Sequence, residues 1–124
     1  MSIGTIRYNE RSWAIDLIGH LKQLAASQQR AVRDAGGEQT VGGDGNSLFS
    51  DVLLFGDLSS ARILQGWELK MPDTGIDDSE FRHNAEAKAR VLGLDSFVLW
   101  NVSHAQLYGL DRAGSFGLIS SGRI

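Results

Sequence analysis

The chain has 124 residues, a formal net charge of −3, 42% hydrophobic and 22% charged residues, and no cysteine. This length and composition predict one globular domain with a buried core and argue against disorder. The lack of cysteine excludes disulfides, thiolate zinc sites and cysteine nucleophiles. Residues 1–7 lack the pattern of a secretory signal, and no stretch is long and apolar enough to span a membrane, so we expect a cytoplasmic protein.

A long amphipathic helix is predicted at residues 9–35, because apolar side chains recur there at intervals of three and four. These side chains are Trp13, Leu17, Leu21 and Leu24, flanked by Ala14, Ile18 and Ala25. Asn9 is the expected N-cap, and Glu10 lies in the first turn, where the helix dipole favours an anion. The glycines at 36–37 are expected to end the helix.

The rest of the chain alternates short apolar runs with turn residues, a pattern typical of strands joined by loops. The elements expected are a short strand at 38–41, a flexible glycine-rich loop at 42–46, and strands at 51–55, 63–70, 96–101 and 105–108. The strands at 51–55 and 63–70 would form a hairpin. The first of them is wholly apolar after its opening Asp51, as in a strand covered on both faces.

A second helix is predicted from the acidic and capping residues at 77–80 to about Leu92, with Gly93 closing it. Its buried face would consist of Phe81, Ala85, Ala89 and Leu92. The predicted order is therefore α-β-β-β-α-β-β, an α/β domain whose central mixed β-sheet is flanked by helices.

A candidate active site follows from the predicted hairpin. Strand geometry places Glu68 and Lys70 on one face, with Leu69 pointing into the core. The hairpin brings Asp51, at the start of the preceding strand, close to Glu68. Two carboxylates beside a lysine suit phosphodiester hydrolysis, because Mg²⁺ prefers carboxylate oxygens and an ammonium held by those carboxylates can orient the attacking water.

These residues resemble a known family. Ser50-Asp51, a spacer of about sixteen residues and Glu68-Leu69-Lys70 are similar to the motif of the PD-(D/E)xK nuclease superfamily, which includes many restriction endonucleases and DNA repair nucleases. Ser50 stands where the motif has proline, which is not a metal ligand. The resemblance covers most of the chain and implies a restriction-endonuclease-like core. It also implies Mg²⁺, with Mn²⁺ as substitute, held by Asp51, Glu68 and the Leu69 carbonyl, with Lys70 orienting water.

A narrower resemblance rests on the amino-acid sequence of residues 51–57 and 65–74, which is similar to that of the N-terminal nuclease domains of large restriction-modification enzymes. It implies that residues 1–124 are one nuclease domain of a longer protein. DNA would be the substrate, and methyltransferase, helicase or translocase modules would be partners, with dimerisation as an option for double-strand cleavage. A second module that holds DNA would also account for the net charge of −3, which is unusual for a protein that binds DNA.

Further residues have two interpretations each. Glu10 is an additional metal ligand by resemblance, or a solvated acid favoured by the helix dipole. Arg82, Asn84 and Lys88 on the second helix are candidates for DNA-backbone contacts, or ordinary surface residues. Asp73, Asp77 and Asp78 could be ligands, although helix capping explains the last two. The rival for the whole chain is a non-cleaving DNA-binding or assembly module of the same fold.

The remaining motifs are given no role. His20, His83 and His104 lie far apart in the sequence and lack the spacing of a metal-binding helix motif. The loop at 42–46 lacks the Gly-Lys-Ser/Thr ending of a phosphate-binding loop, so nucleotide binding is not expected.

Overall fold

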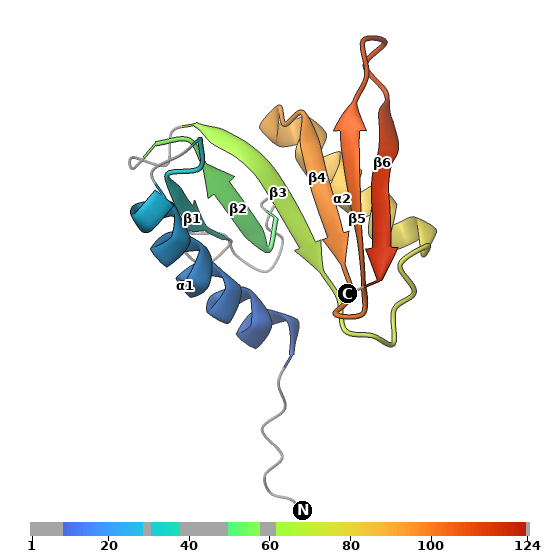
Figure 1. Cartoon of the computed structure of the whole chain (residues 1–124). Helices are drawn as coiled ribbons and strands as arrows, with labels where there is room; N and C mark the ends of the chain where they lie inside the picture. The colour runs from blue at the N-terminus through green and yellow to red at the C-terminus, as the bar shows by residue number, and fades with distance from the viewer. Residues whose placement is uncertain (1–8, 29–30, 38–49, 58–61, 124) are drawn as a thin grey trace, which may run out of the picture.

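The computed structural model describes residues 9–28, 31–37, 50–57 and 62–123, and these form an α/β fold with two helices and a six-stranded mixed sheet (Figure 1). The elements are α1 (Glu10–Gln28), β1 (Asp34–Gly36), β2 (Val52–Phe55), β3 (Ile63–Leu69), α2 (Ser79–Leu92), β4 (Ser96–Trp100), β5 (His104–Leu110) and β6 (Phe116–Arg123). The predicted strand at 38–41 and loop at 42–46 lie outside the described residues.

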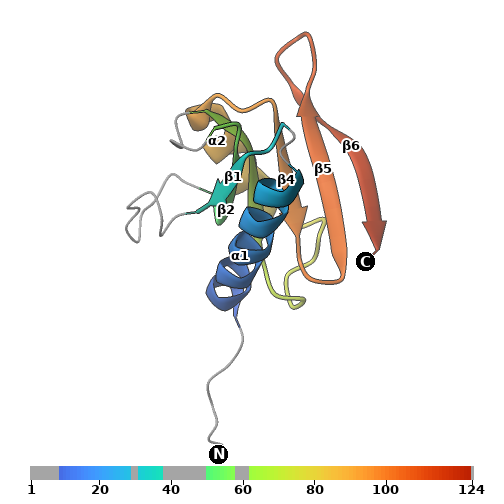
Figure 2. The ribbon, with the colours of Figure 1, turned by 60° about the vertical axis from the view of Figure 1, so that its left-hand side comes forward.

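The strands are ordered β1-β2-β3-β4-β5-β6, each beside its neighbour in the sequence. All pairs are antiparallel except β3 and β4, which run parallel because α2 connects them. Figures 1 and 2 show α1 against the β1–β2 side of the sheet and α2 behind β3 and β4. Because β3 and β4 are parallel, their carboxyl ends lie at the same edge of the sheet.

The core has two parts. On one face Trp13 and Ala14 of α1 pack with Val52 and Leu69, and Trp13 meets the ring of Trp100 edge-on at 4.9 Å. The second cluster joins α2 to β4 and β5 through Phe81, Ala85, Ala89, Leu94, Phe97, Leu99 and Tyr108. Because side chains alternate along a strand, burying Leu69 against α1 turns Glu68 toward α2.

Helix α1 begins where the sequence predicts, since the Asn9 carboxamide oxygen accepts a hydrogen bond from the Ser12 amide at 3.0 Å. Its predicted end at Ala35 is wrong. The helix stops at Gln28, and Asp34–Gly36 form the edge strand β1, in which Ala35 is buried opposite Leu54. Ala25 is the last buried residue of α1, so the final turn of the helix as described has no buried side chain that would favour its continuation.

Helix α2 matches the prediction closely. Asp78 is its N-cap and accepts from the Phe81 amide at 3.0 Å, and Gly93 ends it in the left-handed region at φ 70°. Phe81, Ala85 and Ala89 are buried, as expected for one face of a helix.

Neither β1 nor β6 was predicted, and the described residues follow the order α-β-β-β-α-β-β-β, which has one strand more after α2 than the predicted α-β-β-β-α-β-β. The residues of β6 beyond Phe116 are exposed, and this strand lacks the apolar alternation that marks a half-buried strand. Its position comes from pairing with β5 across a turn in which the Asp111 carboxylate accepts from the amides of Ala113 and Ser115. Among the described helices, none has the length and apolar content needed to cross a membrane.

Candidate active site

Asp51 and the Glu68-Leu69-Lys70 triplet meet where β2 begins and β3 ends. Val52 is paired with Trp67 across the antiparallel hairpin, which sets Asp51 beside Glu68. One Asp51 carboxylate oxygen, Oδ2, accepts a hydrogen bond from the Leu69 amide at 2.8 Å. The proximity predicted from the hairpin is confirmed, and the backbone of the triplet itself fixes the Asp51 carboxylate.

Asp51 and the triplet border an open cavity of about 380 Å³ between the sheet, the start of α1 and helix α2. Its lining contains almost all of the site residues expected from the sequence: Glu10, Asp51, Glu68, Leu69, Lys70, Asn84 and Lys88. The apolar remainder of the wall comes from α2, namely Phe81, Ala87 and Val91. Positions spread over most of the chain are thus brought to one concave site, as is typical of ligand-binding and catalytic sites.

Glu68 is the most perturbed group of the cavity. It is only 8% exposed, its Oε1 accepts from the Lys88 ammonium at 2.8 Å, and its Oε2 is buried without a hydrogen-bond partner among the residues that the structure describes. Burial raises the pKa of Glu68 from 4.5 to about 7, and the nearby negative charge of Asp51 adds to the rise. The positive charge and hydrogen bond of Lys88, and the backbone of Asp51, oppose the rise. A strongly perturbed carboxyl group in a cavity is a common sign of a functional site.

The cation that pairs with Glu68 is Lys88, whereas the sequence led us to expect Lys70 in this role. Lys70 lines the same cavity but is exposed, and its backbone amide donates to the Trp100 carbonyl at 3.0 Å. Lys88 lies 20 residues after Glu68 in the sequence, and it reaches Glu68 because α2 packs across β3. Spacing along the chain carries no signal for such a contact.

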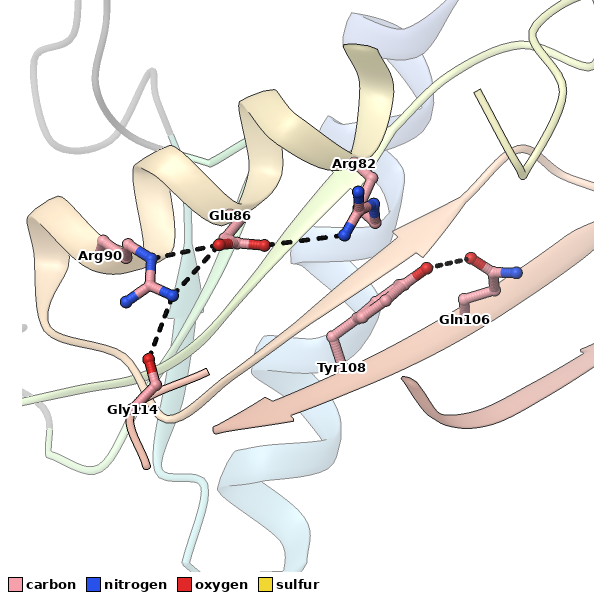
Figure 3. Close-up of polar contacts among 6 residues, drawn as sticks. All are labelled: Arg82, Glu86, Arg90, Gln106, Tyr108 and Gly114. Atoms are coloured by element: carbon pink, nitrogen blue, oxygen red, sulfur yellow. Dashed lines mark hydrogen bonds and ion pairs between the residues drawn. The ribbon is translucent and has the colours of Figure 1, made fainter. Parts of the chain in front are cut away.

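The other two residues suggested for DNA contact are placed differently. Asn84 is exposed and lines the cavity, whereas Arg82 is absent from the lining. Figure 3 shows Arg82 beside Glu86, at 4.0 Å, while Arg90 holds the other Glu86 oxygen at 3.2 Å and donates to the Gly114 carbonyl in the β5–β6 turn. This side of α2 therefore attaches the helix to the hairpin β5–β6.

The same attachment is reinforced on β5. Tyr108 donates from its hydroxyl to the Gln106 carboxamide oxygen at 2.9 Å, as Figure 3 shows, and Gln106 donates to Asp77 at 3.2 Å. Burial raises the pKa of the Tyr108 hydroxyl, and the positive charge of Arg82 opposes this effect. Asp78 caps α2 as expected, whereas the partner of Asp77 is the Gln106 side chain and not a helix amide.

The acidic side chains at this site could supply only some of the ligands that a hard cation such as Mg²⁺ needs. Within the described ranges, no three His, Cys, Asp or Glu residues are close enough together to hold a metal ion by themselves. The oxygen atoms at hand are those of Asp51, Glu68 and the Leu69 carbonyl, and Mg²⁺ is commonly held by one or two carboxylates with water and phosphate completing its shell. The unpartnered Glu68 Oε2 supplies the buried acceptor that such an ion would satisfy.

Two glycines that the sequence analysis left without a site role support Asp51 from behind. A methyl group on Gly37 would collide with the Asp51 carbonyl oxygen, and one on Gly66 would collide with the Ser50 hydroxyl. Gly37 and Ser50 are both buried. Gly37 and Gly66 therefore allow the close packing of the Ser50–Asp51 segment, which a larger residue at either position would displace.

Comparison of the chain with protein-family models, with curated proteins and with solved structures gives no match.

Proposed function

We propose that this chain is a magnesium-dependent DNA nuclease domain whose PD-(D/E)xK site consists of Asp51, Glu68 and Lys70. The observation that carries the proposal is Glu68 Oε2, a buried carboxylate oxygen to which no described residue hydrogen-bonds, in a cavity that Asp51 also lines. Leaving a buried acceptor unsatisfied costs free energy, and a bound cation would remove that cost. An oxygen-only donor set suits Mg²⁺, with Mn²⁺ as substitute.

In the proposed reaction, the ligands would be Asp51, Glu68 and the carbonyl of Leu69, with Glu10, which lines the same cavity, as an auxiliary acid. The ion, when bound, would neutralise charge on the scissile phosphate and lower the pKa of a coordinated water. The hydrogen bond from the Leu69 amide holds Asp51 in place before any ligand arrives, which reduces reorganisation on binding. Lys70, exposed at the cavity, would orient the attacking water and stabilise developing negative charge.

The order of helices and strands along the chain supports this assignment. Helix α1, the three antiparallel strands β1–β3, helix α2 and the parallel strand β4 follow the sequence expected of a restriction-endonuclease-like core. The proposed substrate is DNA, and the proposed setting is a cytoplasmic restriction-modification or related DNA-defence system with methyltransferase, helicase or translocase modules. Asn84 and Lys88 at the cavity, and Arg82 further along α2, are the proposed DNA-backbone contacts, and dimerisation would serve double-strand cleavage.

The second candidate function is a non-cleaving DNA-binding or assembly module of the same fold. The ion pair between Lys88 and Glu68 favours it, because an attached ammonium already neutralises one of the acids that a metal would need. The net charge of −3 also disfavours unaided DNA binding. The two functions differ in one measurable property, which is metal-dependent cleavage.

The test is nicking of supercoiled plasmid by the polypeptide that carries residues 1–124, with Mg²⁺, with Mn²⁺, with Ca²⁺ and with a chelator. We expect cleavage with Mg²⁺ and Mn²⁺, binding without cleavage with Ca²⁺, and none with the chelator. Asp51→Asn should lose both cleavage and metal binding, because an amide in this position is a poorer ligand. DNA binding without any Mg²⁺-dependent nicking would favour the non-cleaving module, and tight Zn²⁺ binding with no response to Mg²⁺ would contradict the proposed site.

A further inference from the structure

Lys88 is held in the cavity by the packing of its helix. It lies three residues after Ala85 and seven after Phe81, so it follows the stripe by which α2 packs against the sheet. Its side chain is 23% exposed, less than that of Lys22 at 47%, which pairs with Asp34 on the surface. Lys88 is therefore a partly buried cation whose ammonium is held at a defined position by Glu68.

The two oxygens of Glu68 are in different situations. Oε1 is bound to the Lys88 ammonium at 2.8 Å, whereas Oε2 is buried and has no hydrogen-bond partner within residues 9–28, 31–37, 50–57 and 62–123. The Glu68 carboxylate thus has one oxygen on the Lys88 ammonium and one oxygen available to a metal ion. An arriving ion can use Oε2 while Lys88 remains on Oε1.

The charges that line the cavity limit how many ions it can hold. Among the described residues of the lining, three carboxylates, those of Glu10, Asp51 and Glu68, stand against two ammonium groups, those of Lys70 and Lys88, which leaves one net negative charge when all are ionised. One divalent ion and one phosphodiester group would bring the sum to zero. A second divalent ion would leave a surplus of two positive charges, which the repulsion between like charges at close range disfavours.

We infer that Lys88 is a built-in cation that takes the place of a second metal ion, so that the site binds one divalent ion per chain. This inference rests on the proposed nuclease function. It makes Lys88 a positioning residue, which holds Glu68 through Oε1 and leaves Oε2 toward the single ion. The ammonium also lies within the cavity that would receive the phosphate, so it adds positive charge there without a second metal.

The test is Mn²⁺ titration of the whole protein, with free Mn²⁺ followed by electron paramagnetic resonance and plasmid cleavage measured in parallel. The wild type should bind one Mn²⁺ per chain. Lys88→Met should bind its first Mn²⁺ at least about tenfold more tightly, because a nearby positive charge is gone, and should accept a second ion at high Mn²⁺. Cleavage by the same variant should nevertheless fall by at least about tenfold. A role in folding alone would not tighten metal binding.

Three further variants separate the outcomes. Lys88→Gln keeps a hydrogen-bond donor for Glu68 without the charge, so it should reproduce the tighter binding and the second ion even if Lys88→Met does not fold. Lys88→Arg should keep the count at one, and Lys22→Met should match the wild type. Two ions bound by the wild type, or unchanged count and affinity in Lys88→Gln, would overturn the inference while leaving the nuclease proposal standing. No Mn²⁺ bound by the wild type would overturn both.

Discussion

Replacing Glu68 by glutamine should stabilise the metal-free protein at alkaline pH and leave its stability unchanged at acid pH. Glutamine has the shape of a protonated glutamic acid, so it removes the cost of burying a charge while keeping the volume of the side chain. The environment responsible is the one described above, in which Glu68 is 8% exposed and lies beside the negative charge of Asp51. A carboxylate kept in such a place is expected to serve function at the expense of stability.

The magnitude and sign follow from the pKa of Glu68. Below pH 4.5 the group is protonated in the folded and unfolded chains, and its ionisation affects neither. Between pH 4.5 and about 7 the unfolded chain releases the proton while the folded chain keeps it, so stability falls as pH rises. Above pH 7 the full cost is present, and at about 1.4 kcal/mol for each pKa unit the difference is about 3 kcal/mol.

The measurement is urea unfolding of the wild type and Glu68→Gln at pH 4.5 and pH 8, with a chelator present. We expect Glu68→Gln to be more stable by about 3 kcal/mol at pH 8 and equal to the wild type, within about 0.5 kcal/mol, at pH 4.5. Glu80→Gln is the matched control, because Glu80 is exposed in the first turn of α2, and it should show no gain at pH 8. A loss of stability at pH 8, or the same gain at both pH values, would refute the reasoning.

Three other predictions concern the supports of the site and its affinity for DNA. Gly37→Ala should lower the free energy of unfolding by about 1–3 kcal/mol and weaken Mn²⁺ binding, because its methyl group would displace the Asp51 carbonyl. Gly19→Ala is the control, because Gly19 has open space around it in α1, and it should raise the free energy of unfolding by about 0.5–1 kcal/mol. Equal effects of the two substitutions in urea unfolding would contradict this account. Val102→Gly should raise the free energy of unfolding by about 1 kcal/mol, because Val102 is held at φ 77° and is 42% exposed, and no gain would mean that the turn is unstrained. Binding of short DNA duplexes by residues 1–124 alone should be weak and without sequence preference, so nanomolar affinity for one sequence at moderate salt would contradict the expected effect of the net charge of −3.

The sequence was sufficient for features that depend on neighbouring residues. The capping of α2 by Asp78 and Gly93 follows from residue types with known backbone preferences. The approach of Asp51 to Glu68 follows from the period of two in a strand and from the closure of a hairpin. These are local rules, and the structure confirms these two features, although the same kind of rule placed the end of α1 wrongly at Ala35.

Features that depend on packing between distant segments could not be predicted in this way. The ion pair of Lys88 with Glu68 requires the angle at which α2 crosses β3, and no spacing encodes that angle. Strand β6 is stabilised by hydrogen bonds to β5 while its side chains remain exposed, so no hydrophobic pattern marks it. The strand β1 has three residues, too few for a period, and Gly37 gains its role from contact with Asp51.

The central claim, that Asp51, Glu68 and Lys70 form a DNA-cleaving site, is tested most directly by the effect of Lys70→Ala on plasmid nicking with Mg²⁺. Lys70 is exposed and has no core contact to lose, so the variant should keep the melting temperature of the wild type. Loss of one preorganised charge at the reacting group typically lowers the rate by about a hundredfold or more. We therefore predict that Lys70→Ala cleaves at least about a hundredfold more slowly while still binding Mn²⁺, with Lys22→Ala as an active control. A folded Lys70→Ala variant as active as the wild type would contradict the claim.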